Sequence, residues 1–348
     1  MNKSLKILFM ISVLAFATFS TVMGTKVLSE VRITTDTYDQ MQPAIYGDII
    51  VWRDDRNGNN DIYGYDLRTN TEFAICTAAR AQGWPAIYGD YVVWRDRRDG
   101  TNYDIWGYNL RNKTEFAITS DSSDKEQPAI YGDIVVWVDT KNGGNNDIFG
   151  YDLKTQQIFP ICTNPADQYQ PSIYGNIVVW RDDRNGTNDI YGYDLNTKSE
   201  FLICQEVRVQ GQPKVYGDYV VWRDRRDGTN YDIWGYNLKT KQQFPITADT
   251  FDKDSPGIYG DIIVWEDTKT GNNDIFGYNL MTNSEFQITT NTSSQEQPSI
   301  YCGRVVYQDY RNGNYDIYLA NLDVVCTTHK SLPMDKILKI LKENKDNE

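Results

Sequence analysis

The chain has 348 residues, a formal net charge of −13 and an apolar content of 40%. This length is enough for two ordinary domains or for one large repeat domain with a substantial core. The acidic balance argues against nucleic acid and anionic membranes as partners.

The first 24 residues have the features of an export signal. Lys3 and Lys6 precede an apolar stretch over 7–19, and residues 22–24 (Val-Met-Gly) suit cleavage before Thr25. An uncleaved N-terminal anchor is the alternative. We therefore expect a secreted protein, at the cell surface or in the periplasm, whose mature chain has no membrane span.

A short leader over 25–29 is expected to precede a strand at residues 30–36, EVRITTD. This segment matches EFQITT at 285–290, which ends the sixth repeat described below. The seventh repeat stops after its third strand. We predict that 30–36 supplies the missing strand and closes the array, because a strand edge left open would face water.

Seven repeats of about 42 residues fill the chain between these ends. Their shared anchor is x-Pro-x-[Ile/Val]-Tyr, and the repeats start near Pro43, Pro85, Pro128, Pro171, Pro213, Pro256 and Pro298. The anchors 43, 85 and 128 recur at 171, 213 and 256, which are 128 residues later in each case. Repeats one to three therefore look like a copy of repeats four to six.

Each repeat is expected to form four short strands. In the first repeat these are PAIY, IIVWRD, DIYGYDL and EFAIC, and the second strand is apolar on consecutive residues. Such a strand is buried on both faces, so the sheets must stack face to face. Closing seven stacked sheets into a ring leaves no end sheet exposed. The sequence therefore predicts an all-β, seven-bladed β-propeller over residues 30–322, with blade seven closed by the N-terminal strand.

Two repeated positions are expected to be structural. An aromatic residue ends the second strand and should pack between blades: Trp52, Trp94, Trp137, Trp180, Trp222 and Trp265, with Tyr307 in blade seven. An aspartate begins the third strand and should hold the preceding loop by hydrogen bonds: Asp61, Asp104, Asp147, Asp189, Asp232, Asp274 and Asp316.

The pattern PxIYGDxVVWxDxRNGxxDIYxYDLxTxxEFxIT resembles propeller repeats of the TolB type. It is most similar to the repeats of cell-surface propeller proteins of methanogenic archaea. The resemblance covers roughly residues 30–322 and implies the fold, whereas propellers serve both as binding scaffolds and as bodies of enzymes. We expect no second domain of the kind that accompanies the propeller in TolB itself.

Metal and nucleophile chemistry find little support in the sequence. Asp55, Asn57, Asn59 and Asp61 place oxygen side chains at alternate positions, as in a calcium loop, but a polar hairpin is the alternative interpretation. No other cofactor is predicted. The only histidine, His329, lies in the tail, so triads with histidine are excluded from the ring.

The candidate binding residues lie on one loop face of the ring. Arginine occupies one position in four blades, at Arg53, Arg95, Arg181 and Arg223. Blades three and six have Val138 and Glu266 there, which breaks the charge symmetry. Pairing with neighbouring aspartates is the alternative role. Trp84 replaces the glutamine found before proline in most blades, as an exposed anchor or as packing.

Cysteines, sequons and the tail complete the predictions. Cys302 and Cys326, near the end of the array, are the one pair that suggests a disulfide. Asn112, Asn185 and Asn291 are candidate glycosylation sites. Residues 323–348 are expected to form a tail with a short amphipathic helix. Asp252 and Asp254, which lie in one predicted loop, are interpreted as solvated acids.

These observations favour a monomeric, non-enzymatic scaffold that binds a protein or polysaccharide partner at the cell envelope. One alternative is a polysaccharide-active enzyme, either a lyase or a glycoside hydrolase with two carboxylates. Another alternative is a periplasmic interaction module like TolB.

Overall fold

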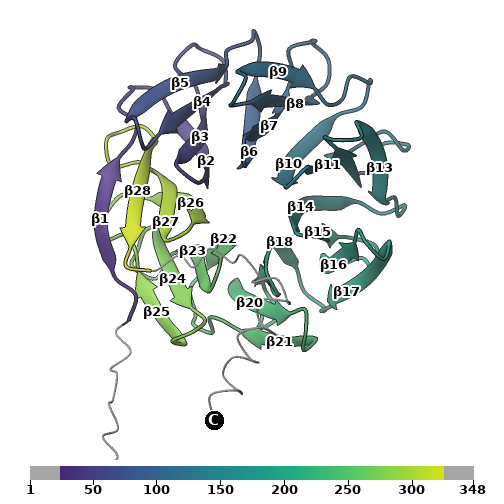
Figure 1. The fold of residues 1–348 in the computed structure, drawn as a ribbon. Helices are drawn as coiled ribbons and strands as arrows, with labels where there is room; N and C mark the ends of the chain where they lie inside the picture. Colours follow the sequence, from purple (N-terminus) through teal and green to yellow (C-terminus); the bar gives the residue numbers. More distant parts are fainter. Residues whose placement is uncertain (1–23, 325–348) are drawn as a thin grey trace, which may run out of the picture.

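The computed structural model describes residues 24–324, which form seven four-stranded antiparallel sheets arranged in a ring (Figure 1). This confirms the predicted seven-bladed propeller. The predicted signal segment before Gly24 and the predicted tail helix within 325–348 lie outside the described residues. Within 24–324 no helix has the length and apolar character needed to cross a membrane.

Each blade runs from an inner strand at the channel to an outer strand at the rim. Blades one to three consist of β2 (Gln40–Tyr46), β3 (Ile49–Asp54), β4 (Asp61–Asp66), β5 (Thr71–Cys76); β6 (Gln82–Tyr88), β7 (Tyr91–Asp96), β8 (Asp104–Asn109), β9 (Thr114–Ala117); and β10 (Lys125–Tyr131), β11 (Ile134–Asp139), β12 (Asp147–Asp152), β13 (Gln157–Cys162). Blades four to six consist of β14 (Gln168–Tyr174), β15 (Ile177–Asp182), β16 (Asp189–Asp194), β17 (Ser199–Cys204); β18 (Gln210–Tyr216), β19 (Tyr219–Asp224), β20 (Asp232–Asn237), β21 (Gln242–Pro245); and β22 (Lys253–Tyr259), β23 (Ile262–Asp267), β24 (Asp274–Asn279), β25 (Ser284–Gln287). Blade seven consists of β26 (Gln295–Tyr301), β27 (Arg304–Asp309), β28 (Asp316–Leu322) and β1 (Val27–Arg32).

The first and last strands of the chain close the ring. β1 pairs antiparallel with β28, and Glu30 lies opposite Ala320. The strand covers 27–32, whereas residues 30–36 were predicted. The difference follows from the matched segment, because β25 also ends at Gln287, before its own Ile-Thr-Thr. After the strand, Thr34 still accepts a hydrogen bond from the Ile317 N–H (2.8 Å).

The second strands form the core between blades. The six predicted tryptophans and Tyr307 are fully buried. Each tryptophan donates its indole N–H to the aspartate two residues later, as Trp52 does to Asp54 (2.8 Å). Tyr307 instead donates to Glu30 on the closing strand (2.7 Å). Within 24–324 the core is therefore seven similar inter-blade clusters. A buried indole–aspartate bond anchors six of them, and the Tyr307–Glu30 bond anchors the seventh.

Every inner strand has a bulge just before its proline. The residue before proline has a positive φ in all seven blades, for example 58° at Gln42 and 54° at Trp84. This conformation is costly for a residue other than glycine, so it has to be supported by its neighbours. The Gln42 side chain accepts a hydrogen bond from the Trp84 N–H of the next blade (2.9 Å). Such links join neighbouring blades at the mouth of the channel.

Aromatic rings line the opposite end of the channel. The tyrosines that end the inner strands contact one another in a closed circle, with centroids 4.4–4.8 Å apart: Tyr46, Tyr88, Tyr131, Tyr174, Tyr216, Tyr259 and Tyr301. The two ends of the channel therefore differ. Polar side chains and loops surround one end, and the circle of seven tyrosines surrounds the other.

Candidate active site

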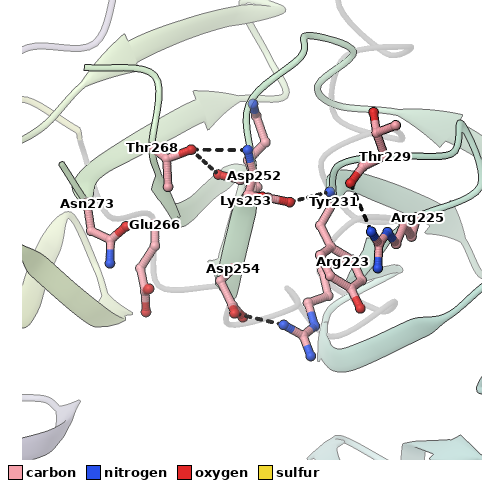
Figure 2. A pocket seen from close by; sticks show the side chains of 10 residues that line it. All are labelled: Arg223, Arg225, Thr229, Tyr231, Asp252, Lys253, Asp254, Glu266, Thr268 and Asn273. Atoms are coloured by element: carbon pink, nitrogen blue, oxygen red, sulfur yellow. Dashed lines mark hydrogen bonds and ion pairs between the residues drawn. The ribbon is translucent and has the colours of Figure 1, made fainter. Parts of the chain in front are cut away.

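A polar pocket of about 350 Å³ lies between blades five and six on the loop face. Figure 2 shows the side chains around it, which come from the β19–β20 loop, β22, β23 and the segments beside them. The lining residues are Arg223, Arg225, Thr229, Tyr231, Asp252, Lys253, Asp254, Glu266, Thr268 and Asn273. The lining contains both acidic and basic side chains, so groups that can exchange protons lie beside cations that can stabilise negative charge.

Two carboxylates face the pocket from neighbouring strands. Asp254 on β22 lies directly opposite Glu266 on β23 in the antiparallel register. Figure 2 shows both side chains extending to the same side of the sheet. Asp254 was interpreted from the sequence as part of a solvated loop. It is instead a strand residue, and this placement brings it to Glu266.

Glu266 is the buried member of this pair, with 9% of its surface exposed. One of its oxygens accepts a hydrogen bond from the Gln297 N–H of blade seven (2.7 Å). Burial raises the pKa of Glu266 to about 7, against the hydrogen bond from Gln297, which lowers it. The nearby charges of Asp254 and Glu296 raise this pKa further. Glu266 is therefore poised to exchange a proton near neutral pH.

Asp254 has a different environment from Glu266. It forms an ion pair with the Arg223 guanidinium (2.7 Å). That guanidinium also stacks over the Tyr231 ring, with its central carbon 4.5 Å from the ring centroid. An adjacent cation favours the charged form of a carboxylate, whereas burial disfavours it. The two acids therefore have different surroundings, as the two carboxylates of glycosidases do.

Hydrogen bonds from the backbone hold the pocket walls. The Tyr231 N–H donates to the Asp252 carboxylate (2.9 Å), and the Asp252 N–H donates to the Thr268 hydroxyl (3.1 Å). Lys253 is fully buried and pairs with Asp249, while its Nζ lies 3.6 Å from Asp267. The loop and the two strands are therefore fixed relative to one another before any ligand binds.

The four predicted arginines all lie on the loop face, but only Arg223 lines this pocket. Arg95 forms an ion pair with Glu126, and Arg53 and Arg181 lie 3.4 and 3.7 Å from Asp55 and Asp183. Each is thus near an acid, as the alternative interpretation proposed. A binding role for them stays a prediction.

Trp84 lies at the mouth of the central channel, with 37% of its surface exposed. It therefore stands apart from the six core tryptophans. The calcium candidate forms a hairpin in which the Asn57 and Asn59 amides donate to Asp61 (2.6 and 2.8 Å). These contacts belong to the polar-hairpin alternative, and calcium binding stays a prediction.

The aspartates that begin the third strands accept hydrogen bonds mainly from side chains. Asp104 accepts from the Thr119 hydroxyl (2.8 Å), and Asp189 accepts from the Asn185 amide (2.8 Å). The Asn185 side-chain amide belongs to the preceding loop, as expected, whereas Thr119 follows the outer strand β9.

Cysteines and sequons are placed as follows. Cys302 is disulfide-bonded, and Cys326 lies outside the described residues, so their predicted pairing is not tested. The candidate glycosylation site Asn112 is exposed, and Asn291 is half-buried. The third candidate, Asn185, uses its amide nitrogen to hold Asp189. The same nitrogen donates to the Tyr191 hydroxyl (3.1 Å), and glycosylation would leave it one N–H for these two acceptors.

Sequence reasoning noticed Glu266 only as a break in the arginine pattern. The signal that identifies the site combines two deviations at facing positions of one blade. Glu266 replaces arginine, and Asp254 stands opposite it. Neither deviation has chemical meaning until the strand register is known.

No family model matches the chain, and no curated protein matches it. An oligogalacturonate lyase in complex with manganese has a similar structure, with a TM-score of 0.65, 13% identity, and coverage of 84% of this chain and 93% of that one. Acylaminoacyl peptidase from Pyrococcus horikoshii has a TM-score of 0.63 and 11% identity, covering 81% of this chain and 50% of that one. TolB from Acinetobacter baumannii has a TM-score of 0.49 and 17% identity, covering 75% and 60%.

These comparisons contradict the expected non-enzymatic scaffold, because the similar structures include a lyase and a peptidase. The sequence argument failed because it sought histidine or an isolated acid pair within a single loop. At these identities the likeness shows the propeller fold alone. The described residues contain no group of three or more His, Cys, Asp or Glu side chains suited to a metal ion. The manganese of the lyase thus has no counterpart here, and we derive no step through it.

Proposed function

We propose that this protein is an enzyme that cleaves glycosidic bonds in a polysaccharide, with Glu266 as general acid and Asp254 as its carboxylate partner. The observation that carries the proposal is the facing pair itself. One acid is buried with a pKa raised to about 7, and the other is paired with Arg223. Glycosidases use two carboxylates whose environments set different roles.

The strand register favours a retaining reaction. Residues directly opposite in an antiparallel pair have Cβ atoms about 4.5–5.5 Å apart. Because both side chains extend to the same side of the sheet (Figure 2), this Cβ spacing favours a carboxyl separation near the roughly 5 Å of retaining enzymes over the larger one that leaves room for water. Asp254 and Glu266 occupy such opposite positions.

The reaction then proceeds in two steps. Asp254 attacks the anomeric carbon while Glu266 gives its proton to the departing glycosidic oxygen, so the C–O bond breaks and a glycosyl ester forms on Asp254. Water next gives a proton to Glu266 as its oxygen bonds to the anomeric carbon and releases Asp254. The acid and the carboxylate are both restored.

A third acid near the pocket, Glu296, is already engaged. It accepts hydrogen bonds from Gln308 (3.1 Å), Tyr315 (3.1 Å) and Asn273 (3.2 Å), so its oxygens are occupied and the catalytic roles fall to Glu266 and Asp254.

The structural likeness to an oligogalacturonate lyase is consistent with a saccharide polymer as substrate. A polymer outside the cell would suit the predicted export. Export, the likeness to archaeal surface propellers and the monomeric state all stay predictions.

A panel of neutral and acidic polysaccharides tests the proposal. New reducing ends should appear with wild-type protein and fall by about 10²–10⁴ in rate with Glu266→Gln, which cannot donate the proton. The anomeric signal in NMR should show retention. Unsaturated products absorbing in the ultraviolet would instead indicate elimination, and turnover unchanged in Glu266→Gln would remove the proposal.

A further inference from the structure

The central channel is a second cavity, of about 420 Å³, lined by the inner strands of all seven blades. The position after proline lines it in every blade, and its residues are Ala44, Ala86, Ala129, Ser172, Lys214, Gly257 and Ser299. Six of the seven are small and uncharged. Within the described part of the chain, Lys214 on β18 is the only charged residue that lines the channel.

The Lys214 side chain has no hydrogen bond or ion pair to any residue within 24–324, whereas its backbone lies opposite Val221 in the β18–β19 pair. Its side chain is exposed, but to the hollow that the seven blades enclose. Burial lowers the pKa of Lys214. Among the described residues, no acid lines the channel to balance this charge. An ammonium group that faces a channel without acids is a partner for an anion that enters, because an adjacent opposite charge favours its charged form.

An aromatic residue stands across the channel from this lysine. Trp84 belongs to β6, and Figure 1 shows β6 and β18 on opposite sides of the channel. The strained φ of 54° and the hydrogen bond to Gln42 hold its backbone at the mouth. The other blades have glutamine or serine at this position. Trp84 and Lys214 therefore break the sevenfold repetition of the channel lining, one with an aromatic surface and the other with a cation.

The number of charges narrows the ligand class. One lysine without a second cation suits a single negative charge better than a phosphate dianion. The indole offers an apolar face of the kind on which a sugar ring packs. Gln212 beside Lys214 uses its carbonyl oxygen for the Ser255 N–H (2.7 Å), so its NH₂ group is left as a donor for a hydroxyl.

We propose that the central channel binds a sugar acid, with its carboxylate on Lys214 and its ring against Trp84. The volume of the channel accommodates a saccharide of one or two units. The site is separate from Glu266 and does not require cleavage there. Ligand enters from the loop face, because the circle of tyrosines lines the other end.

Glucuronate tests this inference, because a monosaccharide has no glycosidic bond to cleave. Titration calorimetry on the full chain should show glucuronate binding at least about tenfold more tightly than glucose, a difference of about 1.4 kcal/mol. Lys214→Ala, which copies Ala86 of blade two, should bind glucuronate no better than glucose. Trp84→Gln, which copies most other blades, should weaken both sugars.

Two controls keep the test decisive. Lys239→Ala removes an exposed lysine of the same blade that pairs with Asp218, and it should leave glucuronate binding unchanged. Thermal unfolding of Lys214→Ala should match wild type, since alanine already occupies this position in three blades. Equal binding of glucuronate by Lys214→Ala and wild type, phosphate binding as tightly as glucuronate, or no glucuronate binding overturns the inference. None of these outcomes bears on cleavage by Glu266.

Discussion

The pocket between blades five and six has a near-duplicate between blades two and three. Eight of its ten lining residues have identical counterparts, and the exceptions are Glu126 for Asp254 and Val138 for Glu266. Arg95 pairs with Glu126 and stacks over Tyr103 (4.4 Å), as Arg223 pairs with Asp254 and stacks over Tyr231 (4.5 Å). The framework is therefore shared, and a single position adds the second carboxylate.

This difference separates architecture from chemistry. In blade three, which has Val138 at this position, Gln127 makes the link to the next blade at the channel mouth. Its side-chain oxygen accepts a hydrogen bond from the Gln170 N–H (2.8 Å). Blade six has Ser255 at that place, which is too short to reach the next blade, and Glu266 accepts from Gln297 instead. Glu266 thus replaces a structural acceptor and also brings a titrating group into the pocket.

Exchanging the two pockets should have the largest effect. Glu266→Val converts the blade-six pocket to the blade-three form and should lower kcat by about 10²–10⁴ in the reducing-end assay, because the proton donor is lost. Glu126→Gln in the duplicate pocket is the matched control and should leave kcat unchanged. Loss of activity in Glu126→Gln alone would assign the chemistry to the other pocket.

The cores beneath the two pockets should respond equally. Trp137→Ala and Trp265→Ala each remove a fully buried indole and should lower the free energy of unfolding by about 3–5 kcal/mol. Each change also leaves Asp139 or Asp267 without its indole donor. Urea denaturation measures both values. A difference of several kcal/mol between them would show that the two frameworks are not equivalent.

The buried acid Glu266 should make the stability of the protein depend on pH. Because the folded state raises the pKa of Glu266 from 4.5 to about 7, it keeps a proton that the unfolded chain loses between these values. Stability from this group is full below the lower value and is lost as pH rises through the upper one, by roughly 3 kcal/mol at most. The free energy of unfolding of Glu266→Val, measured relative to wild type, should therefore be higher at alkaline pH than at acid pH.

Urea denaturation at pH values on either side of this window measures the effect. Glu285→Gln, at an exposed acid that pairs with Lys269 on the same blade, serves as the control: it keeps Glu266 and should retain the window. Parallel stability profiles for Glu266→Val and wild type would contradict the raised pKa.

Removing the two arginines should have the smallest effect. Their ion pairs are partly exposed, so Arg223→Ala and Arg95→Ala should each cost about 0–1 kcal/mol in stability. Arg223→Ala also leaves the Asp254 charge uncompensated beside Glu266 and should shift the alkaline limb of the pH–rate profile upward. Arg95→Ala should leave that limb unchanged. Identical profiles for both variants would separate Arg223 from the chemistry.

The sequence predicts the ring because the pattern of each strand can be recognised within a single repeat. The consecutive apolar residues before Trp52 and the Pro43 anchor recur often enough to fix blade number, core and closure. The site is different in kind. Asp254 and Glu266 are 12 residues apart and meet only through the register of β22 and β23. The raised pKa of Glu266 depends on burial by blade seven, which no local pattern contains.

The channel also escaped prediction, for a related reason. Lys214 is one lysine among many in the sequence, and its meaning depends on the six small residues that face it around the axis. Trp84 was noticed as an exception, but its partner across the channel was not. Repeats make exceptions easy to find, whereas only the ring shows which exceptions are neighbours.

The pairing of β1 with β28 means that the first and last described strands share one sheet. The Lys26 N–H also donates to Asp323 (2.6 Å), so both ends leave the ring at one point on its rim. During synthesis the ring stays incomplete until residue 322 has been made, since contacts this distant in sequence form late. A circular permutant that joins 26 to 323 and is cut between two other blades should fold without waiting for its last strand to meet its first across this seam.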